Sequence, residues 1–386
     1  MKFTLAKEEL TNALSFAVSA ISTNSTLPVM SGVLIKASDG KVVFEATDLD
    51  SSCKIVTSAL VDEEGSSVLP GKMFFDIAKS LEDASVTIAT DDSKATITCE
   101  QAVFATSVLN ANEFPGFPHI QTSARVEIPF SKFQSMVKKV VKSASRDDSK
   151  GIFTGIFLEV SNGKVRAVAS DSFRVAIAEE IIEVGGDSEF EAIIPPHFLS
   201  GITSLSADDK TVCIAYNENQ VLIEVGDITF INRRLQGQFP DYKRLISPSN
   251  ETTLVVDKQS LIKAVKRVSV LRDENAAIVF DVNIEKEFLQ LSINNSSNGA
   301  ATEIIPVKAS GVDCTVGFDS GYLMDGLSSI GTNDVLITLS AGKQPTHLSP
   351  CVESRENFSF ENVFETADNM LKNKFLYLVM PVVKTN

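Results

Sequence analysis

Residues 129–150 read PFSKFQSMVKKVVKSASRDDSK, and residues 151–178 continue as GIFTGIFLEVSNGKVRAVASDSFRVAIA. In the first part, apolar residues recur at the spacing of one helix face, which predicts an amphipathic helix over 130–146. In the second part, Asn162 and Gly163 separate two runs of alternating apolar residues, the strongest short-range signal of a β-hairpin. The stretch therefore predicts a helix packed on a hairpin.

The two faces of the predicted helix differ sharply in character. Its apolar face comprises Phe133, Met136, Val137, Val140 and Val141. Its opposite face is basic and comprises Lys132, Lys138, Lys139, Lys142 and Arg146. No acidic residue occurs between 130 and 146, although the whole chain of 386 residues has a net charge of −15. The helix is therefore a local reversal of the charge of the chain.

The same unit occurs three times along the chain. Residues 32–48, GVLIKASDGKVVFEATD, align without a gap with residues 155–171, GIFLEVSNGKVRAVASD. A third copy starts at Leu254 and has lost the Asn-Gly or Asp-Gly turn, but it keeps the order of one helix and following strands. The copies begin about 125 residues apart, as expected for repeated domains rather than for short solenoid repeats.

Each copy also has a second half with its own helix and strands. Helices are predicted near 6–20, 72–82, 196–206, 257–272 and 319–330, besides 130–146. The fold class is therefore α+β, with three domains that each consist of a pseudo-twofold pair of helix-plus-four-strand units. We expect the domains at 1–123, 124–248 and 249–386, with an insertion near 353–374 in the last one.

The distribution of charge leaves two interpretations open. The predicted helix over 257–272 carries Lys258, Lys263, Lys266, Arg267 and Arg272 against one acid, Asp257, while the other four helices beyond 130–146 are close to neutral. Lysine-rich helix faces are commonly just solvated. Alternatively, the helices face one anionic partner, and the acidic remainder of the chain repels other polyanions.

Composition excludes several classes of protein. The five cysteines (Cys53, Cys99, Cys213, Cys314 and Cys351) are scattered and show no Cys-x-x-Cys pattern. We therefore expect reduced, buried thiols in a cytoplasmic protein, without a disulfide framework or a metal site. The opening residues MKFTL lack an apolar signal region, and no apolar run reaches membrane-spanning length. No cofactor-binding motif is present.

Six short motifs in this order resemble those of the bacterial DNA polymerase III beta subunit, the sliding clamp family. They are MKFTL with Thr26-Leu27-Pro28, Phe74-Phe75-Asp76-Ile77, Ala169-Ser170-Asp171, Gln238-Phe239-Pro240-Asp241-Tyr242 and Tyr377-Leu378-Val379-Met380-Pro381. The resemblance covers nearly the whole chain. It implies a processivity factor, with no catalytic site of its own, that encircles double-stranded DNA as a head-to-tail homodimer. Helices would line the ring and sheets would form its outer wall.

The resemblance implies sequence-independent contacts between DNA and the inner helices. The DNA-lining residues would be Asn24, Lys72, Lys79, Lys132, Lys138, Lys139, Lys142, Arg146, His197, Lys263, Lys266 and Arg267. The family often has a basic residue just before its Thr-Leu-Pro loop, whereas this chain has Asn24-Ser25. A modestly basic lining suits sliding, because affinity for the phosphate backbone rises with each neutralised phosphate.

The resemblance also implies a cleft that binds short peptides of the replicative polymerase, the clamp loader and repair proteins. Its residues would be Phe153, Ser170, Ser172, Phe173, Arg174, Val175, Pro240, Arg244, Leu245, Leu378, Val379, Met380, Pro381 and Val382. Core packing is the alternative for Val175 and Leu378. The family commonly has His where this chain has Phe173, so we expect a more apolar cleft there. Arg174 would donate hydrogen bonds to the peptide, and the last strand would be an edge of the third domain.

The implied dimer interface is largely apolar in this chain. It would join Phe104 and Thr106 of one copy to Val270 and Leu271 of the next. The family often places a string of acids on the third-domain side, where this chain reads Asn294-Asn295-Ser296-Ser297. The insertion near 353–374 would either form an outer loop or cover part of the cleft.

An enzyme and a repeat adaptor without a DNA partner are the two alternatives to a clamp. An enzyme is disfavoured because the chain has no phosphate loop, nucleophile elbow or zinc-protease motif, and because His119, His197 and His347 fall in different domains. The paired Asp48 and Asp171 occupy equivalent repeat positions, which suggests a role in a turn rather than in catalysis. A repeat adaptor without a DNA partner is the remaining alternative.

Overall fold

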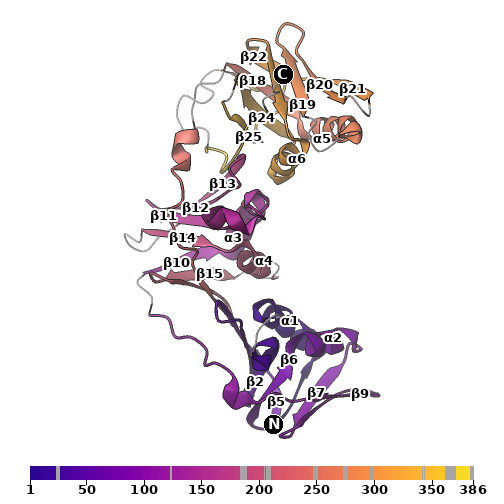
Figure 1. The fold of residues 1–386 in the computed structure, drawn as a ribbon, viewed down its shortest axis with the longest axis vertical. Helices are drawn as coiled ribbons and strands as arrows, with labels where there is room; N and C mark the ends of the chain where they lie inside the picture. The colour runs from indigo at the N-terminus through magenta and orange to yellow at the C-terminus, as the bar shows by residue number, and fades with distance from the viewer. Residues whose placement is uncertain are drawn as a thin grey trace. The chain divides into compact units, whose positions relative to one another are not determined.

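A computed structural model describes residues 1–22, 27–121, 124–182, 189–203, 205, 210–246, 251–272, 277–295, 299–340, 342, 344–360 and 371–382. The chain divides into two compact units (Figure 1). The first comprises Met1–Phe133 and His197–Arg234, and the second comprises Gln134–Glu183, Glu189–Pro196 and Leu235–Asn386. Asn24 lies outside the described residues, and so does the segment 361–370 of the predicted insertion.

The described part of the first unit contains two antiparallel sheets. The five-stranded sheet has the order β5 (Leu60–Glu63), β1 (Lys2–Ala6), β7 (Ser85–Thr90), β8 (Lys94–Cys99) and β9 (Ala102–Ser107). The eight-stranded sheet has the order β10 (Ala124–Pro129), β15 (Thr211–Tyr216), β16 (Gln220–Val225), β17 (Ile228–Arg233), β4 (Ser51–Ser58), β3 (Lys41–Thr47), β2 (Gly32–Ser38) and β6 (Gly65–Pro70).

The described part of the second unit repeats this plan. The nine-stranded sheet has the order β14 (Phe190–Ile194), β11 (Ile156–Ser161), β12 (Lys164–Ser170), β13 (Arg174–Ile181), β26 (Phe375–Val379), β25 (Thr346–Cys351), β24 (Asp334–Leu339), β18 (Thr252–Asp257) and β22 (Lys308–Gly311). The four-stranded sheet has the order β21 (Gly299–Pro306), β20 (Phe288–Asn295), β19 (Ile278–Asn283) and β23 (Cys314–Phe318).

These sheets confirm the predicted α+β class and add a feature that the sequence did not reveal. In each pseudo-twofold pair, the strand that opens one half joins the three-stranded meander of the other half. Thus β1 pairs with β7, while β6 pairs with β2. The same exchange pairs β18 with β24 and β23 with β19. Neither half of a domain could keep its four-stranded sheet without the other, because the opening strand comes from the partner half.

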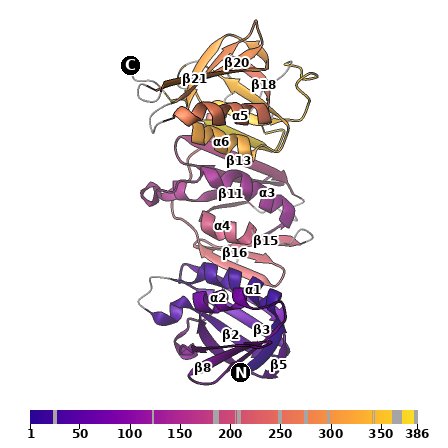
Figure 2. The ribbon, with the colours of Figure 1, turned by 90° about the vertical axis from the view of Figure 1, so that its right-hand side faces the viewer.

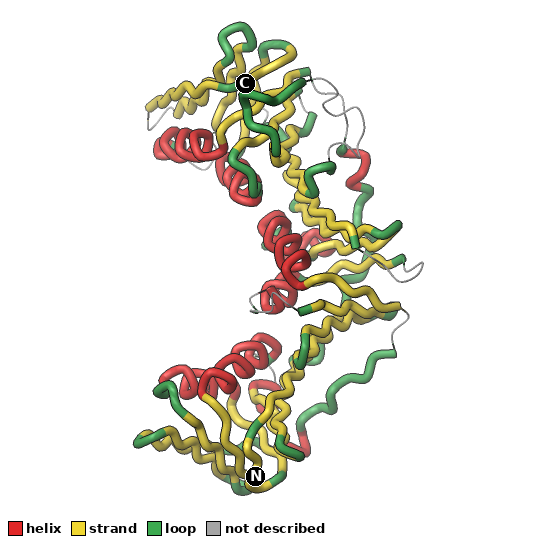
Figure 3. The backbone as a smooth tube through the Cα atoms, turned by 180° about the vertical axis from the view of Figure 1, so that it is seen from behind, coloured by secondary structure: helices red, strands yellow, loops and turns green. Residues whose placement is uncertain are grey.

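Helices lie on one side of the sheets within each unit (Figure 3). They are α1 (Lys7–Ala17), α2 (Gly71–Ser80), α3 (Phe130–Val140), α4 (Pro196–Thr203), α5 (Lys258–Val268) and α6 (Ser320–Ser329). Short 3-10 turns are η1 (Val18–Ala20), η2 (Pro28–Ser31), η3 (Ala111–Glu113), η4 (Val141–Ser143), η5 (Asp148–Thr154), η6 (Tyr242–Leu245) and η7 (Ser269–Leu271). In the first unit α1 packs beside α2 (Figure 2), and in the second unit α5 packs beside α6.

Each helix is shorter than its predicted range. The prediction of 130–146 was wrong at its end, because Val141–Ser143 tightens into η4 and Ala144 then adopts an extended backbone. The apolar face is as predicted, with Phe133, Met136, Val137 and Val140 all buried. Asp257 and Asp319 are N-caps rather than helical residues, since their carboxylates accept hydrogen bonds from the amides of Ser260 and Tyr322.

The predicted turns are present where the repeats align. Asn162 and Gly163 have φ of 51° and 70° between β11 and β12. These positive values fit a type I′ hairpin turn, the kind that Asn-Gly favours. At the next turn, Asp171 Oδ1 accepts hydrogen bonds from the amides of Phe173 and Arg174. Asp48 does the same for Asp50 and Ser51, which confirms that these paired acids have a turn role.

The position of the last strand corrects one expectation. β26 is not an edge, since it pairs with β25 on one side and with β13 on the other, in the register Arg174↔Val379 to Ala178↔Phe375. All five of its residues are buried. The order of the repeat placed β26 in the third domain, but the apolar run FLYLV does not identify a second neighbour.

Two further expectations concern the cysteines and the membrane. All five cysteines are free and buried, as predicted. Burial raises the pKa of Cys53 and of Cys314, which keeps these thiols protonated. In the part of the chain that the structure describes, no helix is both long enough and apolar enough to span a bilayer.

Gly326 offers a test of how α6 packs on β26. A Cβ atom added at Gly326 would lie 2.5 Å from Cδ1 of the buried Tyr377 ring. We expect Gly326→Ala to lower the free energy of unfolding by about 1–3 kcal/mol through overpacking, although alanine favours helix. Urea denaturation of the second unit measures this loss. Gly331→Ala is the control, because its added Cβ meets no atom within 4 Å. Equal stability of the two variants would contradict this packing.

Candidate functional site

A cavity of about 450 Å³ opens in the second unit where the hairpin β12–β13 meets the end of β26. It is lined by Phe153, Ser170, Ser172, Arg174, Val175, Phe239, Pro240, Asp241, Tyr242, Arg244, Leu245, Pro345, Leu378 and Met380. Three segments far apart in the sequence meet here, because β13 pairs with β26 and residues 239–245 cross the same sheet face. The lining is mainly apolar with a polar rim, as small-ligand and peptide sites usually are.

Ten of the fourteen residues predicted for the cleft line this cavity. They are Phe153, Ser170, Ser172, Arg174, Val175, Pro240, Arg244, Leu245, Leu378 and Met380. Val379 points into the core instead, with none of its surface exposed. Pro381 and Val382 follow β26 outside the cavity lining, where the amide of Val382 donates to the carbonyl of Gly317 at 2.8 Å. Val175 and Leu378 line the cavity and also belong to the hydrophobic core, so the cleft and the core-packing alternatives both hold for them.

Phe173 corrects the expectation of a more apolar cleft. Its side chain is 52% exposed and lies outside the cavity lining. It stacks on Tyr322, with ring centroids 6.2 Å apart, and the ammonium of Lys150 lies 4.9 Å from its ring centroid. The positive φ of Ser172, 79°, turns the chain at this point. Phe173 therefore forms an aromatic shelf beside the cavity rather than part of its wall.

Arg174 is held by the protein itself. Its Nε donates to Asp171 Oδ2 at 2.9 Å, Nη1 to Asp325 Oδ2 at 2.5 Å, and Nη2 to the carbonyl of Lys142 at 2.6 Å. Burial tends to lower its pKa, but the nearby Tyr377 and carboxylates outweigh this and raise it. That Arg174 donates hydrogen bonds to a peptide stays a prediction, and the structure adds that most of its N–H groups already fix the hairpin to α6 and to η4, just after α3.

Sequence reasoning missed four lining residues, Phe239, Asp241, Tyr242 and Pro345. Phe239 stacks on Phe157 with centroids 5.0 Å apart and meets Phe153 edge-on at 6.2 Å. The motif Gln238-Phe239-Pro240-Asp241-Tyr242, which contains three of these residues, was the available signal. The aromatic packing makes residues 239–245, hereafter the wall segment, one side of the cavity.

The wall segment is also fastened through polar groups. Glu159 on β11 receives a hydrogen bond from the Tyr242 hydroxyl at 2.7 Å and from the Lys243 ammonium at 2.7 Å. Burial favours protonation of Glu159, but the bonds from Lys243 and Tyr242 prevail and lower its pKa. Burial and the bond to Glu159 together raise the pKa of Tyr242. The carboxylate therefore stays charged and the phenol neutral.

A buried histidine supports the end of the wall segment. His347 on β25 lies with Nε2 3.3 Å from the carbonyl of Leu245 and Nδ1 3.2 Å from the hydroxyl of Thr338. Burial lowers the pKa of His347, and the contact with Leu245 only partly offsets this. The neutral imidazole is thus the form that fits beneath the cavity rim.

The basic residues predicted to line DNA differ in availability. Lys138, Lys142, Lys263 and Lys266 are exposed on or just after α3 and α5, and Lys72 and Lys79 are exposed on α2. Lys139 is half-buried with its ammonium 5.9 Å from the Phe375 ring centroid, and burial lowers its pKa. Arg267 pairs with Glu303 of β21 in the same chain, so its charge is locally neutralised. Arg146 lies beyond the helix, and the side chain of His197 is outside the described atoms.

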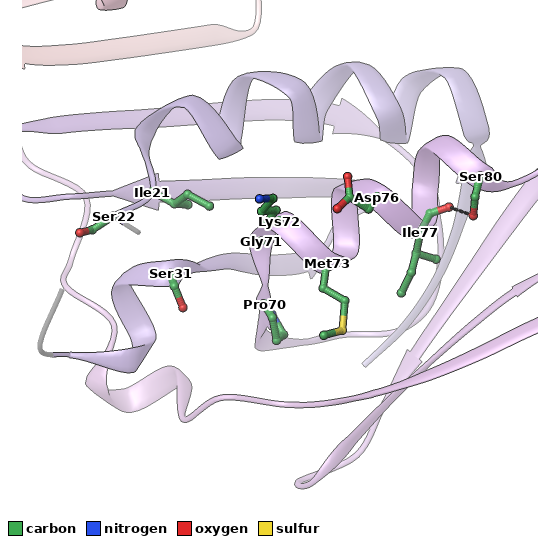
Figure 4. Close-up of a pocket in the computed structure, with 10 residues that line it drawn as sticks. All are labelled: Ile21, Ser22, Ser31, Pro70, Gly71, Lys72, Met73, Asp76, Ile77 and Ser80. Atoms are coloured by element: carbon green, nitrogen blue, oxygen red, sulfur yellow. Dashed lines mark hydrogen bonds between the residues drawn. The ribbon is translucent and has the colours of Figure 1, made fainter. Parts of the chain in front are cut away.

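A second hollow, of about 750 Å³, lies against α2 in the first unit (Figure 4). Its lining is Ile21, Ser22, Ser31, Pro70, Gly71, Lys72, Met73, Asp76, Ile77 and Ser80. Met73 and Ile77 extend from the same side of α2, and Asp76 from the other (Figure 4). The hydroxyl of Thr106, on the edge strand β9, donates to Met73 Sδ at 3.4 Å. The hollow, hereafter the α2 groove, therefore adjoins the predicted interface residues Phe104 and Thr106.

The other predicted interface residues lie in the second unit. Val270 and Leu271 belong to η7, which follows α5 and packs against β20 and β21. Val270 is 79% exposed, and Ile304 on β21 is 57% exposed. Among the described strands, β21 ends its sheet just as β9 ends the five-stranded sheet. The first unit thus presents the α2 groove beside β9, and the second unit presents the apolar surface of Val270 and Leu271, hereafter the Val270–Leu271 step, beside β21. Neither β9 nor β21 has a neighbour on its outer edge in the described chain.

No group of three or more His, Cys, Asp or Glu in the described residues is arranged to hold a metal ion. His119 is exposed, and His347 is buried together with the Thr338 hydroxyl that it contacts, out of reach of a substrate.

Three family models match the chain in succession. The N-terminal domain of the DNA polymerase III beta subunit matches residues 1–118, the central domain matches 127–241, and the C-terminal domain matches 243–363. The chain belongs to the DNA polymerase III beta subunit family. It has three clamp domains, and its function is that of a DNA sliding clamp, a processivity factor and not an enzyme. The boundaries at 123 and 248 stay predictions.

Individual relatives agree with this assignment. The beta sliding clamp of Synechocystis sp. is 29% identical over 374 residues, covering 91% of this chain and 96% of the relative. The beta sliding clamp of Bacillus subtilis is 27% identical over 360 residues, covering 89% and 94%. The crystal structure of the Pseudomonas aeruginosa sliding clamp bound to griselimycin has a TM-score of 0.89 at 25% identity, with full coverage of both chains.

His347 predicts a pH dependence of stability. Its folded pKa lies below the ordinary value of 6.5, so the unfolded chain takes up the proton first as the pH falls. The stability that the neutral imidazole supports is present above about pH 6.5 and is lost below it. We expect His347→Gln to flatten this part of the profile, measured as urea midpoints between about pH 7.5 and 5.5. The exposed His119→Gln variant is the control. An unchanged profile in His347→Gln would contradict the assignment.

Proposed function

We propose that two copies of this chain join head to tail into a ring around double-stranded DNA, with helices lining the hole and sheets outside. The observation that carries this proposal is the pair of unlike apolar surfaces, the α2 groove beside β9 and the Val270–Leu271 step beside β21. Unlike surfaces on one chain make a heterologous contact, which closes into a ring when the rotation permits. Edge strands with an unpaired outer side favour addition of a strand from another chain.

The sequence and the described side chains support an apolar contact between the copies. Val270 would insert beside Met73, Phe104 and Thr106 of the next copy. Arg267 and Glu303 are paired within one chain, so they contribute less charge across the interface. We infer an interface whose affinity depends little on salt, since exposed ion pairs are the component that salt screens.

We propose that the lining of the ring contacts DNA weakly. Exposed positive charges come from Lys138 on α3, Lys142 just after it on η4, Lys263 and Lys266 on α5, and Lys72 and Lys79 on α2. Few phosphates are neutralised by so few charges, and such binding fades as salt rises. Retention would therefore depend on encirclement rather than on contact strength. We place this activity in the cytoplasm, where bacterial DNA is replicated.

The cavity in the second unit is proposed as the site that recruits the polymerase, the clamp loader and repair proteins through short peptide segments. Its apolar lining suits one or two apolar anchors, and Met380 and Leu245 on the rim are both partly exposed. A methionine adapts to differently shaped partners. The described ends of the insertion, 353–360 and 371–374, are not among the lining residues.

The ring can be tested at its joint. We expect Val270→Ala with Leu271→Ala to sediment as a folded monomer and to be lost from closed circular DNA that retains the wild type, because the apolar contact is removed. Wild-type protein should slide off the same DNA once it is linearised. Val352→Ala, at another exposed valine, is the control. A double variant that still sediments as a dimer would place the joint elsewhere.

The cavity can be tested with a truncation. A fluorescent tail peptide of the replicative polymerase should bind the wild type with a Kd of about micromolar, or about −8 kcal/mol. We expect removal of residues 380–386 to abolish binding, since it takes Met380 out of the cavity lining but leaves β26 complete. Removal of 383–386 alone keeps Met380 and serves as the control. Equal affinity of both truncations would remove the cavity from the proposal.

A further inference from the structure

We propose that Glu159 is the positioning residue of the cavity: one buried carboxylate, outside the cavity lining, holds the wall segment in the shape that admits a peptide. This inference rests on the proposed role of the cavity as a peptide site. It concerns a residue that contacts no peptide itself and acts through Tyr242 and Lys243.

The wall segment has few backbone ties to the sheets. Its hydrogen bonds between backbone atoms are internal, from Tyr242 to Pro240, Arg244 to Asp241 and Ile246 to Lys243. Yet residues 239–242, 244 and 245 all line the cavity. A segment with only local backbone bonds keeps its position through side chains. Aromatic packing on Phe157 sets its distance from the sheet, but stacked rings can slide.

Glu159 supplies the directional contacts that ring packing lacks. Its two oxygens accept from two consecutive residues of the wall segment, Tyr242 and Lys243, at 2.7 Å each. The side chain of Glu159 is only 7% exposed, and Tyr242 is buried as well, so the charge-assisted bond between them is shielded from water, whereas the Lys243 side chain is 54% exposed. Displacement of the wall segment would leave a buried carboxylate short of partners, which is strongly unfavourable.

Glu159 is in turn fixed from its other side. On the same sheet face, β11, β12 and β13 place Glu159, Arg166 and Glu179 opposite one another in register. Arg166 Nε donates to Glu179 Oε2 at 2.6 Å, and its Nη1 lies 3.8 Å from Glu159 Oε2. This row of three charged residues lies on the same sheet face as Phe157, Val168 and Ile177, which pack beneath the wall segment. One sheet face thus carries an apolar floor at one end and a charged anchor at the other.

The first repeat shows that the fold itself does not require this anchor. In the ungapped alignment of residues 32–48 with 155–171, Lys36 takes the place of Glu159. Later in each repeat, residues 113–117, EFPGF, correspond to residues 238–242, QFPDY, so Phe117 takes the place of Tyr242. Phe117 has no hydroxyl, and Lys36 pairs instead with Glu45 of the neighbouring strand at 2.8 Å. The first repeat thus keeps the same strands and helix as the second without a tie of this kind. The anchor therefore accompanies the cavity and not the domain architecture.

The decisive experiment is a double-mutant cycle on peptide binding by the full-length protein. The probe is the fluorescent tail peptide of the replicative polymerase, and both Kd and dissociation rate are measured. We expect Glu159→Gln to raise the Kd about tenfold, because the neutral amide offers one acceptor oxygen to the two donors of Tyr242 and Lys243. Most of the change should appear in the dissociation rate. Tyr242→Phe keeps the ring and should weaken binding about three- to tenfold.

The cycle separates positioning from a general loss of stability. If Glu159 acts through Tyr242, the double variant should bind no more weakly than Glu159→Gln alone. Glu180→Gln is the matched control, since it changes a carboxylate of similar burial on the same strand β13 that pairs with Lys374 and not with Arg166 or the wall segment. It should leave the Kd within twofold of the wild type.

Three results would overturn the inference. They are an unchanged Kd in both Glu159→Gln and Tyr242→Phe, additive effects in the double variant, or an equal loss of affinity in the control Glu180→Gln. Wild-type protein that fails to bind the peptide would overturn the proposed peptide site itself, and this inference with it. Because Tyr242→Phe removes one oxygen atom only, the test stands even if Glu159→Gln perturbs the fold.

Discussion

The antiparallel pairing of β13 with β26 is the contact on which the second unit depends. It joins the central hairpin to a strand 200 positions further along the chain and makes one sheet of nine strands from two sets. Its turn end is locked by Arg174, which links Asp171 on the hairpin to Asp325 on α6. The cavity lies across this pairing, so its floor has the rigidity of a sheet interior rather than the mobility of a loop.

Local chemistry explains which features could be predicted. The period of 3.6 placed the buried face of α3, and Asn162-Gly163 placed a hairpin, because both depend on neighbours in sequence. The gapless repeat predicted six similar units and the turn role of Asp48. Ten lining residues of the cavity followed from resemblance to a family whose motifs this chain keeps.

The features that could not be predicted depend on tertiary partners. The apolar run of residues 375–379, FLYLV, is the same whether β26 has one neighbouring strand or two. The exchange of opening strands between halves conserves the order of elements and so leaves no trace in the pattern. The side-chain direction of Phe173 follows from the positive φ of Ser172 and from Tyr322, which is about 150 residues away. Tyr242 reads as an ordinary turn residue until Glu159 is seen beneath its hydroxyl.

The distance along the chain between the walls of the cavity has a consequence for synthesis. Val175 and Leu378, which pair with each other in the cavity lining, are 203 residues apart (378 − 175). While a ribosome is still translating the third domain, the hairpin lacks β26, and the cavity has neither Leu378 nor Met380. Domains made first can fold first, but the cavity is complete only in chains whose translation has passed residue 380.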